Sequence, residues 1–254
     1  MYIKNTLFVG KVLLGFEALA STNGYAAELL TKSRPIEGTV ISTFRQTAGR
    51  GQIGSHWESE PDKNIALSII LYPTFIIPLH QFYLNMAIAI AVRDVIAKYT
   101  KKRVKIKWPN DIYVETRKIT GMLIQNTLAA NTLHASIIGI GINVNQTTFS
   151  KNAPNATSLA LETGHTFSLY DLVEDLCQQV EQRYLSLKNS NNNDTLRELY
   201  LSHLYRFHES SNYQKADGTR FTGTITGISE SGKLIIENSG ASETFDIKAI
   251  RFLN

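Results

Sequence analysis

The stretch that decides the fold spans residues 104–144 and reads VKIKWPNDIYVETRKITGMLIQNTLAANTLHASIIGIGINV. Its short apolar runs, separated by polar turn residues, are typical of neighbouring strands in one sheet. They predict a strand at Val104–Trp108, a hairpin of Ile112–Val114 with Ile119–Gln125, and a buried strand at His134–Val144.

Further strands and helices are predicted on both sides of this stretch. Apolar and β-branched runs predict strands at Leu7–Leu13, Thr39–Phe44 and Asn64–Tyr72. Helical spacing of apolar residues predicts helices at Tyr25–Leu30, Phe82–Lys98, Leu169–Leu187 and Thr195–Tyr205. Mixed strands and helices indicate an α/β or α+β domain.

The hydrophobic pattern of the sequence changes after Phe207. Thr219–Ile228, Lys233–Glu237 and Glu243–Ile247 alternate apolar and polar residues, which predicts half-buried strands joined by glycine turns. A unit of about 50 residues is at the small end for independent folding. We therefore predict two domains, residues 1–206 and a small β-barrel at 207–254.

Composition limits the classes of function. The net charge is +4, with 26 Lys and Arg against 22 Asp and Glu, a balance too even to indicate a nucleic-acid partner. The lone Cys177 excludes a disulfide within the chain and favours a reducing compartment. The apolar stretch near the N-terminus is interrupted by Lys11 and followed by Glu17, which is unlike a signal peptide. We expect a soluble cytoplasmic protein, monomeric or homodimeric, without membrane contact.

The first candidate for chemistry is the glycine-rich loop Gly49-Arg50-Gly51-Gln52-Ile53-Gly54, which leads to Trp57. Glycines allow the backbone close to a ligand, and an arginine fork suits phosphate or carboxylate. A flexible surface hairpin with an exposed arginine is an equally good interpretation. The loop matches neither a P-loop nor a dinucleotide fingerprint.

A second candidate is Lys107-Trp108-Pro109-Asn110-Asp111 at the end of a predicted strand. Polar side chains at a rigid strand end are well placed for a ligand, although Asn-Asp is also ordinary turn chemistry. Lys118, three residues before Gly121, becomes interesting only if it points into the same cleft.

Glycines alternate with isoleucines in Ile138-Gly139-Ile140-Gly141-Ile142-Asn143-Val144. Because side chains alternate along a strand, Gly139 and Gly141 leave one sheet face bare. The bare face admits either a flat ligand group or a closely packed helix.

In combination, these segments resemble the biotin–protein ligase (biotin–[acetyl-CoA-carboxylase] ligase) family. The matching segments are Ser21-Thr22-Asn23, Gln46-Thr-Ala-Gly-Arg-Gly51 with Trp57, Lys107-Trp-Pro-Asn-Asp111, Arg117-Lys-Ile-Thr-Gly121 and Gly139-Ile-Gly-Ile-Asn143. The resemblance implies the mixed sheet of class II aminoacyl-tRNA synthetases and biotin ligases, followed by an SH3-like barrel. It also implies ATP and biotin as substrates, Mg²⁺ as cofactor, and the biotin carboxyl carrier domain of a carboxylase as partner.

The resemblance implies a role for each matching residue. The biotin pocket would consist of Ser21, Thr22, Asn23, Gln46, Arg50, Gly51, Gln52, Lys118 and Gly121. The ATP and adenylate site would consist of Arg50, Trp57, Lys107, Asn110, Asp111, Gly139, Gly141 and Asn143. Lys118, Arg50 and Asp111 would be the catalytic residues, and Asp111 would also bind Mg²⁺.

The sequence departs from the family at the glycine-rich loop. Many members carry further basic residues where this chain has Gln52, Ile53 and Ser55, so we expect weaker retention of the adenylate. About 20 residues precede Ser21, too few for the DNA-binding domain of some relatives, which predicts a monofunctional enzyme without nucleic-acid binding. Two alternatives stay open: a lipoate or octanoate ligase, although no R-R-x-x-G-G-G segment occurs, and an inactive biotin-binding module.

Overall fold

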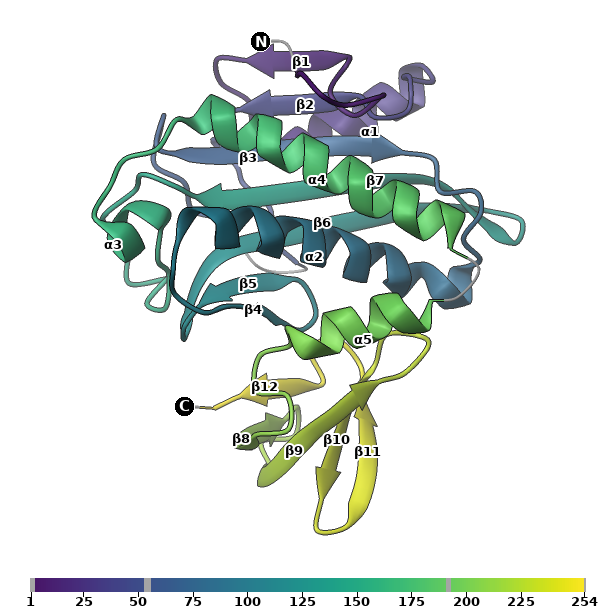
Figure 1. The fold of residues 1–254 in the computed structure, drawn as a ribbon, viewed down its shortest axis with the longest axis vertical. Helices are drawn as coiled ribbons and strands as arrows, with labels where there is room; N and C mark the ends of the chain where they lie inside the picture. Colours follow the sequence, from purple (N-terminus) through teal and green to yellow (C-terminus); the bar gives the residue numbers. More distant parts are fainter. Residues whose placement is uncertain (1–2, 53–55, 191–192, 254) are drawn as a thin grey trace.

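A seven-stranded mixed sheet forms the centre of the computed structural model, which describes residues 3–52, 56–190 and 193–253 (Figure 1). Its strands, in spatial order, are β1 (Leu13–Phe16), β2 (Val40–Thr43), β3 (Asn64–Leu71), β7 (Thr132–Asn143), β6 (Arg117–Ala129), β5 (Asp111–Val114) and β4 (Val104–Lys107). Only β1 and β2 pair in parallel among these; every other neighbouring pair is antiparallel. The stretch 104–144 forms the consecutive strands β4 to β7, which confirms the mixed-sheet prediction.

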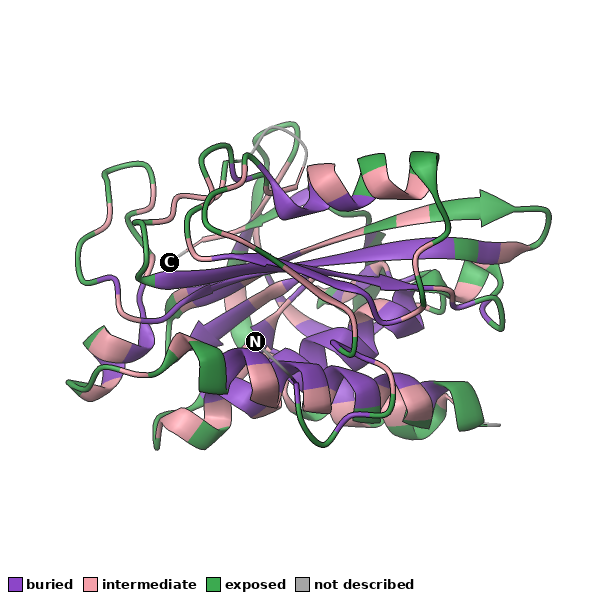
Figure 2. Cartoon of the chain, turned by 90° about the horizontal axis from the view of Figure 1, so that it is seen from above, coloured by how far each residue is buried: buried purple, intermediate pink, exposed green. Residues whose placement is uncertain are grey.

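Helices cover both faces of this sheet. Helices α2 (Gln81–Tyr99) and α4 (Leu169–Asn189) lie across one face, and their apolar residues form the main core with alternate residues of β3 and β7. On the other face, α1 (Thr22–Lys32) packs through Ala26 on Ile41, Ile70 and Ile137. Figure 2 shows the buried central strands between the two helical layers. This double covering explains the continuous apolar runs in the sequence.

The C-terminal region forms a second, five-stranded antiparallel sheet. Its strands, in spatial order, are β11 (Ala241–Phe245), β10 (Leu234–Asn238), β9 (Arg220–Ile228), β8 (Ser210–Lys215) and β12 (Ile250–Phe252). The short helices η1 (Pro78–His80), α3 (Leu159–Thr163) and α5 (Asp194–Ser202) complete the elements of the described residues. The boundary between residues 206 and 207 stays a prediction.

The two sheets are joined at a specific contact. The Trp108 indole N–H donates to the Gly232 carbonyl at 2.9 Å. A Cβ atom at Gly232 would lie 2.3 Å from the Phe82 ring, so the turn fits against α2 only because it is glycine. The C-terminal domain is therefore held against the seven-stranded sheet at the end of β4.

The predicted strand at Leu7–Leu13 is wrong. Leu7, Phe8 and Val9 donate their backbone N–H groups to the buried Glu181 carboxylate, at 2.6 to 2.9 Å, instead of to a strand. Gly10 then turns the chain with φ of 77°, and β1 begins at Leu13. A carboxylate from helix α4 therefore takes the place of the hydrogen bonds that a neighbouring strand would supply. The local hydrophobic pattern does not reveal such a distant partner.

Helix α4 also contains the chain's lone cysteine. Cys177 is fully buried, and burial raises the pKa of its thiol to about 12. It is therefore a core residue and not a nucleophile, as predicted. No helix within residues 3–52, 56–190 and 193–253 combines the length and hydrophobicity that crossing a membrane requires.

Candidate active site

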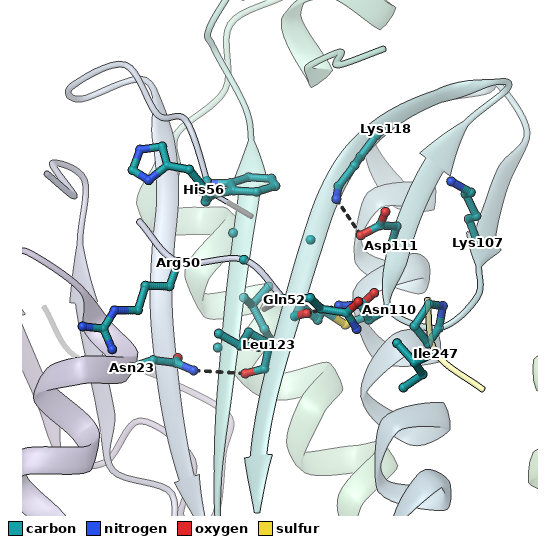
Figure 3. Close-up of a pocket in the computed structure, with 18 of the residues that line it drawn as sticks. Asn23, Arg50, Gln52, His56, Lys107, Asn110, Asp111, Lys118, Leu123 and Ile247 are labelled. Atoms are coloured by element: carbon teal, nitrogen blue, oxygen red, sulfur yellow. Dashed lines mark hydrogen bonds and ion pairs between the residues drawn. The ribbon is translucent and has the colours of Figure 1, made fainter. Parts of the chain in front are cut away.

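A cavity of about 490 Å³ lies on the α1 face of the large sheet, between α1 and the C-terminal domain (Figure 3). It is lined by every predicted site residue except Asn143, namely Ser21, Thr22, Asn23, Gln46, Arg50, Gly51, Gln52, Trp57, Lys107, Asn110, Asp111, Lys118, Gly121, Gly139 and Gly141. The sequence motifs, which are far apart in the chain, therefore meet in one place.

The floor of the cavity is a row of paired residues that crosses the sheet. Ala66 pairs with Gly141, Gly141 with Gly121, Gly121 with Asp111, and Asp111 with Lys107. Directly paired residues point to the same face of a sheet. The floor is therefore bare in the middle and charged at its β4 end.

A β-bulge places Lys118 on this face. The register between β5 and β6 shifts so that Ile112 pairs with Thr120 whereas Tyr113 pairs with Lys118. The extra residue, Ile119, is fully buried in the main core on the opposite face. Without the bulge, Lys118 would lie on the face of Thr120, away from Asp111.

The cavity end beside α1, or neutral end, is built from uncharged side chains that hydrogen bond to one another. The Gln46 side-chain oxygen accepts from the Thr22 backbone N–H at 2.9 Å. Ser68, on β3, donates to the Asn23 side-chain oxygen at 2.6 Å, and Asn23 donates to the Leu123 carbonyl at 3.1 Å. These residues therefore present fixed polar atoms before any ligand arrives.

The bare face of β7 is covered in both of the ways that the sequence allowed, by a closely packed helix and by a flat group. At Gly139 it accommodates close helix packing, since a Cβ atom there would lie 2.1 Å from the side-chain oxygen of Asn23 on α1. At Gly141 it accommodates a flat group, the indole of Trp57, which would be 2.5 Å from a Cβ atom. The same indole lies over Gly121, at 2.9 Å from a Cβ atom there.

The opposite cavity end is cationic. The Lys118 ammonium lies 2.7 Å from the Asp111 carboxylate and 5.8 Å from the centroid of the Trp57 ring. Lys107 donates to the Tyr113 hydroxyl at 3.1 Å and lies 5.1 Å from the centroid of the Phe252 ring.

Burial lowers the pKa of Lys107, and the Asp111 carboxylate opposes that shift. Asp111 is the one carboxylate among the described lining residues, and it faces more cations than it balances. This end of the cavity therefore attracts anions.

Two predicted residues lie differently from the expectation. Arg50 lines the cavity, but it is exposed, and its guanidinium points away from Lys118 and Asp111 (Figure 3). The Asn110 amide lines the cavity yet donates to the Met122 carbonyl of β6, so it also fixes the turn after β4. Ile53 lies outside the described residues, as does Ser55.

Asn143 belongs to a second cavity, of about 290 Å³. Trp57 and Lys118 line both cavities, so the indole separates them. The Asn143 amide donates to the Thr157 carbonyl at 2.9 Å, whereas its buried oxygen has no hydrogen-bond partner among the described residues. An unpaired buried acceptor beside an aromatic wall suits a planar ligand with an amino group.

Sequence reasoning missed the lining residues of the C-terminal domain. These are Ile247, Lys248, Ile250, Arg251 and Phe252. No local motif marks them, since they reach the cavity only through the docking of the two sheets. His56 lines both cavities and was also missed, although it directly precedes Trp57.

No group of three or more His, Cys, Asp and Glu side chains that could hold a metal occurs among the described residues. Asp111 alone therefore cannot make a complete protein site for a cation. A cation there would need further oxygen ligands from a substrate or water.

The mixed sheet, the small β-domain and a cavity with one neutral and one cationic end define the catalytic part of a cofactor–protein ligase. The Biotin/lipoate A/B protein ligase family matches residues 15–143, about half of the chain. The chain belongs to this family, and within it to the biotin–protein ligases.

Relatives extend the likeness over nearly the whole chain. The Bifunctional ligase/repressor BirA of Bacillus subtilis (strain 168) is 31% identical over 94% of this chain and 74% of its own length. The Biotin--[acetyl-CoA-carboxylase] ligase of Paracoccus denitrificans is 25% identical over 92% of this chain and 99% of its own. A solved biotin protein ligase from Aquifex aeolicus in complex with biotin and ATP has a TM-score of 0.79 at 23% identity, covering 96% of this chain and 100% of that one. The last comparison establishes the fold.

Proposed function

We propose that this protein is an ATP-dependent biotin–protein ligase, which makes biotinyl-5'-AMP and transfers biotin to a carrier lysine. The observation that carries the proposal is a single cavity with a preformed neutral end and a cationic end. Biotin has the matching shape, with a neutral, hydrogen-bonding ring system and a carboxylate at the end of its chain. The activities named for the relatives in Bacillus subtilis and Paracoccus denitrificans support the same function.

The neutral end fits the biotin ring system. Ser21, Thr22, Asn23 and Gln46 offer oriented donors and acceptors that are already held by the protein. A ligand that binds such groups does not have to order them first. With the rings at this end, the acid chain would run toward Lys118 along the Trp57 indole, which lies over Gly121.

The cationic end fits the step in which two anions must meet. An oxygen of the biotin carboxylate would attack the α-phosphorus of ATP, with pyrophosphate leaving from the opposite side. Lys118 and Lys107 would offset the repulsion between the two anions and stabilise charge on the transferring phosphoryl group. Lys118 is held in place by Asp111 until then, at 2.7 Å.

The second cavity fits the adenine. Trp57 offers a flat face, and the unpaired oxygen of Asn143 would accept from the amino group of the base. Asp111 would help to hold Mg²⁺, because Mg²⁺ is commonly bound by one or two carboxylates together with substrate phosphates. The metal would supply further neutralisation of phosphate charge.

The second half-reaction needs no further protein nucleophile. The neutral amine of the acceptor lysine would attack the acyl carbon, and AMP would leave with the bonding electrons. We propose a biotin carboxyl carrier domain of a carboxylase as the acceptor, in line with the ligase of Paracoccus denitrificans. A monomeric or homodimeric enzyme stays a prediction.

Biotin-dependent exchange of labelled pyrophosphate into ATP tests the proposal, with lipoate and octanoate in parallel. Exchange with biotin alone supports both the adenylation step and the choice of acid. Exchange with lipoate would assign the chain to the lipoate branch. A folded sample that binds biotin but exchanges nothing would favour an inactive biotin-binding module.

A further inference from the structure

A buried carboxylate lies behind the site. Glu162, on α3, has a side chain only 2% exposed. One oxygen accepts from Arg117 at 2.6 Å and from the Thr157 hydroxyl at 2.5 Å, and the other accepts from Lys102 at 2.8 Å. Burial alone would raise the pKa of Glu162, but hydrogen bonds from Lys102 and Thr157 and the charge of Arg117 lower it below its usual range. Glu162 is therefore ionised at neutral pH.

The partners of Glu162 adjoin two residues of the proposed nucleotide site. Arg117 directly precedes Lys118 in β6. The Thr157 backbone N–H donates to the Lys118 carbonyl at 2.8 Å, and the Thr157 carbonyl accepts from the Asn143 amide at 2.9 Å. One buried carboxylate thus fixes a segment that holds Lys118 on one side and Asn143 on the other.

The neutral cavity end has no such connection. Among the described residues, its hydrogen bonds join α1 to Gln46, to Ser68 and to strand β6 at Leu123 and Gln125. None of these groups contacts Glu162 or its partners in those bonds. A change at Glu162 therefore reaches the cationic end and the second cavity before it reaches the neutral end.

We propose that Glu162 is a positioning residue for the nucleotide: it aligns Lys118 and Asn143 through Arg117 and Thr157. The inference rests on the proposed biotin–protein ligase function. Loss of its charge removes the ion-pair partner of Arg117 and Lys102, whose side chains are 44% and 45% exposed, and it loosens the segment around Thr157. The expected result is weaker use of ATP with biotin recognition retained.

Glu162→Gln tests the role because the amide keeps the size of the side chain and removes its charge. In pyrophosphate exchange the KM for ATP rises about tenfold, the factor expected when one hydrogen bond to a charged group is lost. The KM for biotin and the Kd for biotin without ATP stay within about twofold of wild type. A purely structural role would shift both substrates together.

Glu181→Gln is the matched control. Glu181 is also a buried carboxylate, 5% exposed, but its partners are backbone N–H groups of residues 7–9. The control variant loses thermal stability while its KM for ATP stays at the wild-type value. An equal rise of the ATP KM in both variants, or an unchanged ATP KM in Glu162→Gln, overturns the inference.

A second variant covers the case in which Glu162→Gln does not fold. Thr157→Val removes one donor to Glu162 and keeps the backbone bonds to Lys118 and Asn143, so it gives a smaller rise of the ATP KM in the same direction. A Thr157→Val enzyme with wild-type ATP KM then counts against the inference. Absence of exchange in the wild-type protein itself would refute the proposed function, which is a separate outcome.

Discussion

The two ends of the main cavity are built on different principles. At the α1 end, polar side chains satisfy one another: Ser68 bonds Asn23, and Gln46 bonds Thr22. At the β4 end, two lysines face one carboxylate, and Lys107 is held in a position that lowers its pKa. The first end is complete without a ligand, whereas the second carries excess positive charge.

The difference indicates how one site selects a neutral group and activates a charged one. A preformed hydrogen-bond array selects by shape and costs little ordering on binding. An excess of half-buried cations destabilises the free protein slightly but stabilises an anionic transition state. Selectivity for the acid is therefore expected at one end and rate acceleration at the other.

Removal of the Lys118 charge should have the largest effect on the cationic end of the cavity. We expect Lys118→Ala to lose pyrophosphate exchange by about a hundredfold or more, the usual effect of removing one preorganised charge-stabilising group. Thermal unfolding should change little. The exposed Lys32, paired with Glu28 at the end of α1, supplies the control Lys32→Ala, which should keep full activity. Near-normal exchange in Lys118→Ala would refute its role.

Two glycines of β7 allow each end of the cavity to be tested separately. A Cβ atom in Gly139→Ala collides with Asn23, so we expect the biotin KM to rise about tenfold. A Cβ atom in Gly141→Ala collides with the Trp57 indole, so the ATP KM should rise by a similar factor. Steady-state kinetics with each substrate varied in turn checks both. If the two variants have the same KM profile, the division into two ends is wrong.

The excess charge can be removed without touching Lys118. Lys107→Met keeps the apolar stem between the rings of Tyr113 and Phe252, and we expect a gain of about 1 kcal/mol in unfolding free energy with severalfold weaker ATP use. Denaturant titration and exchange kinetics measure the two effects. Lys105→Met, at another lysine of β4 whose pKa burial also lowers, should leave the ATP KM unchanged. Loss of stability in Lys107→Met would contradict this account.

The glycine-rich loop should have a smaller effect on the cationic end. Gln52 lines the cavity where many family members carry a basic residue. We expect Gln52→Arg to slow release of biotinyl-5'-AMP about threefold by adding a charge beside an anion, an effect screened by salt. Rapid-quench measurement of the released adenylate, with Gln52→Met as the uncharged control, checks it. Equal release rates in both variants would show that loop charge does not retain the intermediate.

The smallest expected effect concerns pH. The folded protein holds the pKa of Glu162 below its ordinary 4.5, so the unfolded chain binds this proton first. The contribution of Glu162 to stability is therefore complete above pH 4.5 and is lost as the pH falls below it. Thermal melts should show a shallower acid decline for Glu162→Gln than for wild type. Parallel declines would mean that other carboxylates dominate.

Motifs predicted the floor and both ends of the cavity because strand pairing brings their residues into one row. The sequence did not reveal that Ile119 forms a bulge, since nothing in its local pattern distinguishes it from a regular strand residue. It did not reveal that Trp57 lies between two cavities, so that Asn143 lines the second one beside Trp57 and Lys118. Arg251 and Phe252 depend on how two sheets dock, a contact encoded by surfaces and not by local spacing.

The row from Ala66 to Lys107 also has a consequence for folding. Strands β4 to β7 are consecutive, so their pairings close short loops and form early, whereas β3 joins β7 across the whole of α2. Gly121 and Gly141 are brought together by a hairpin, but Ala66 arrives only with the long-range pairing. Recovery of biotin binding during refolding should therefore follow the slow pairing of β3 with β7. Biotin would then serve as a probe for this long-range step.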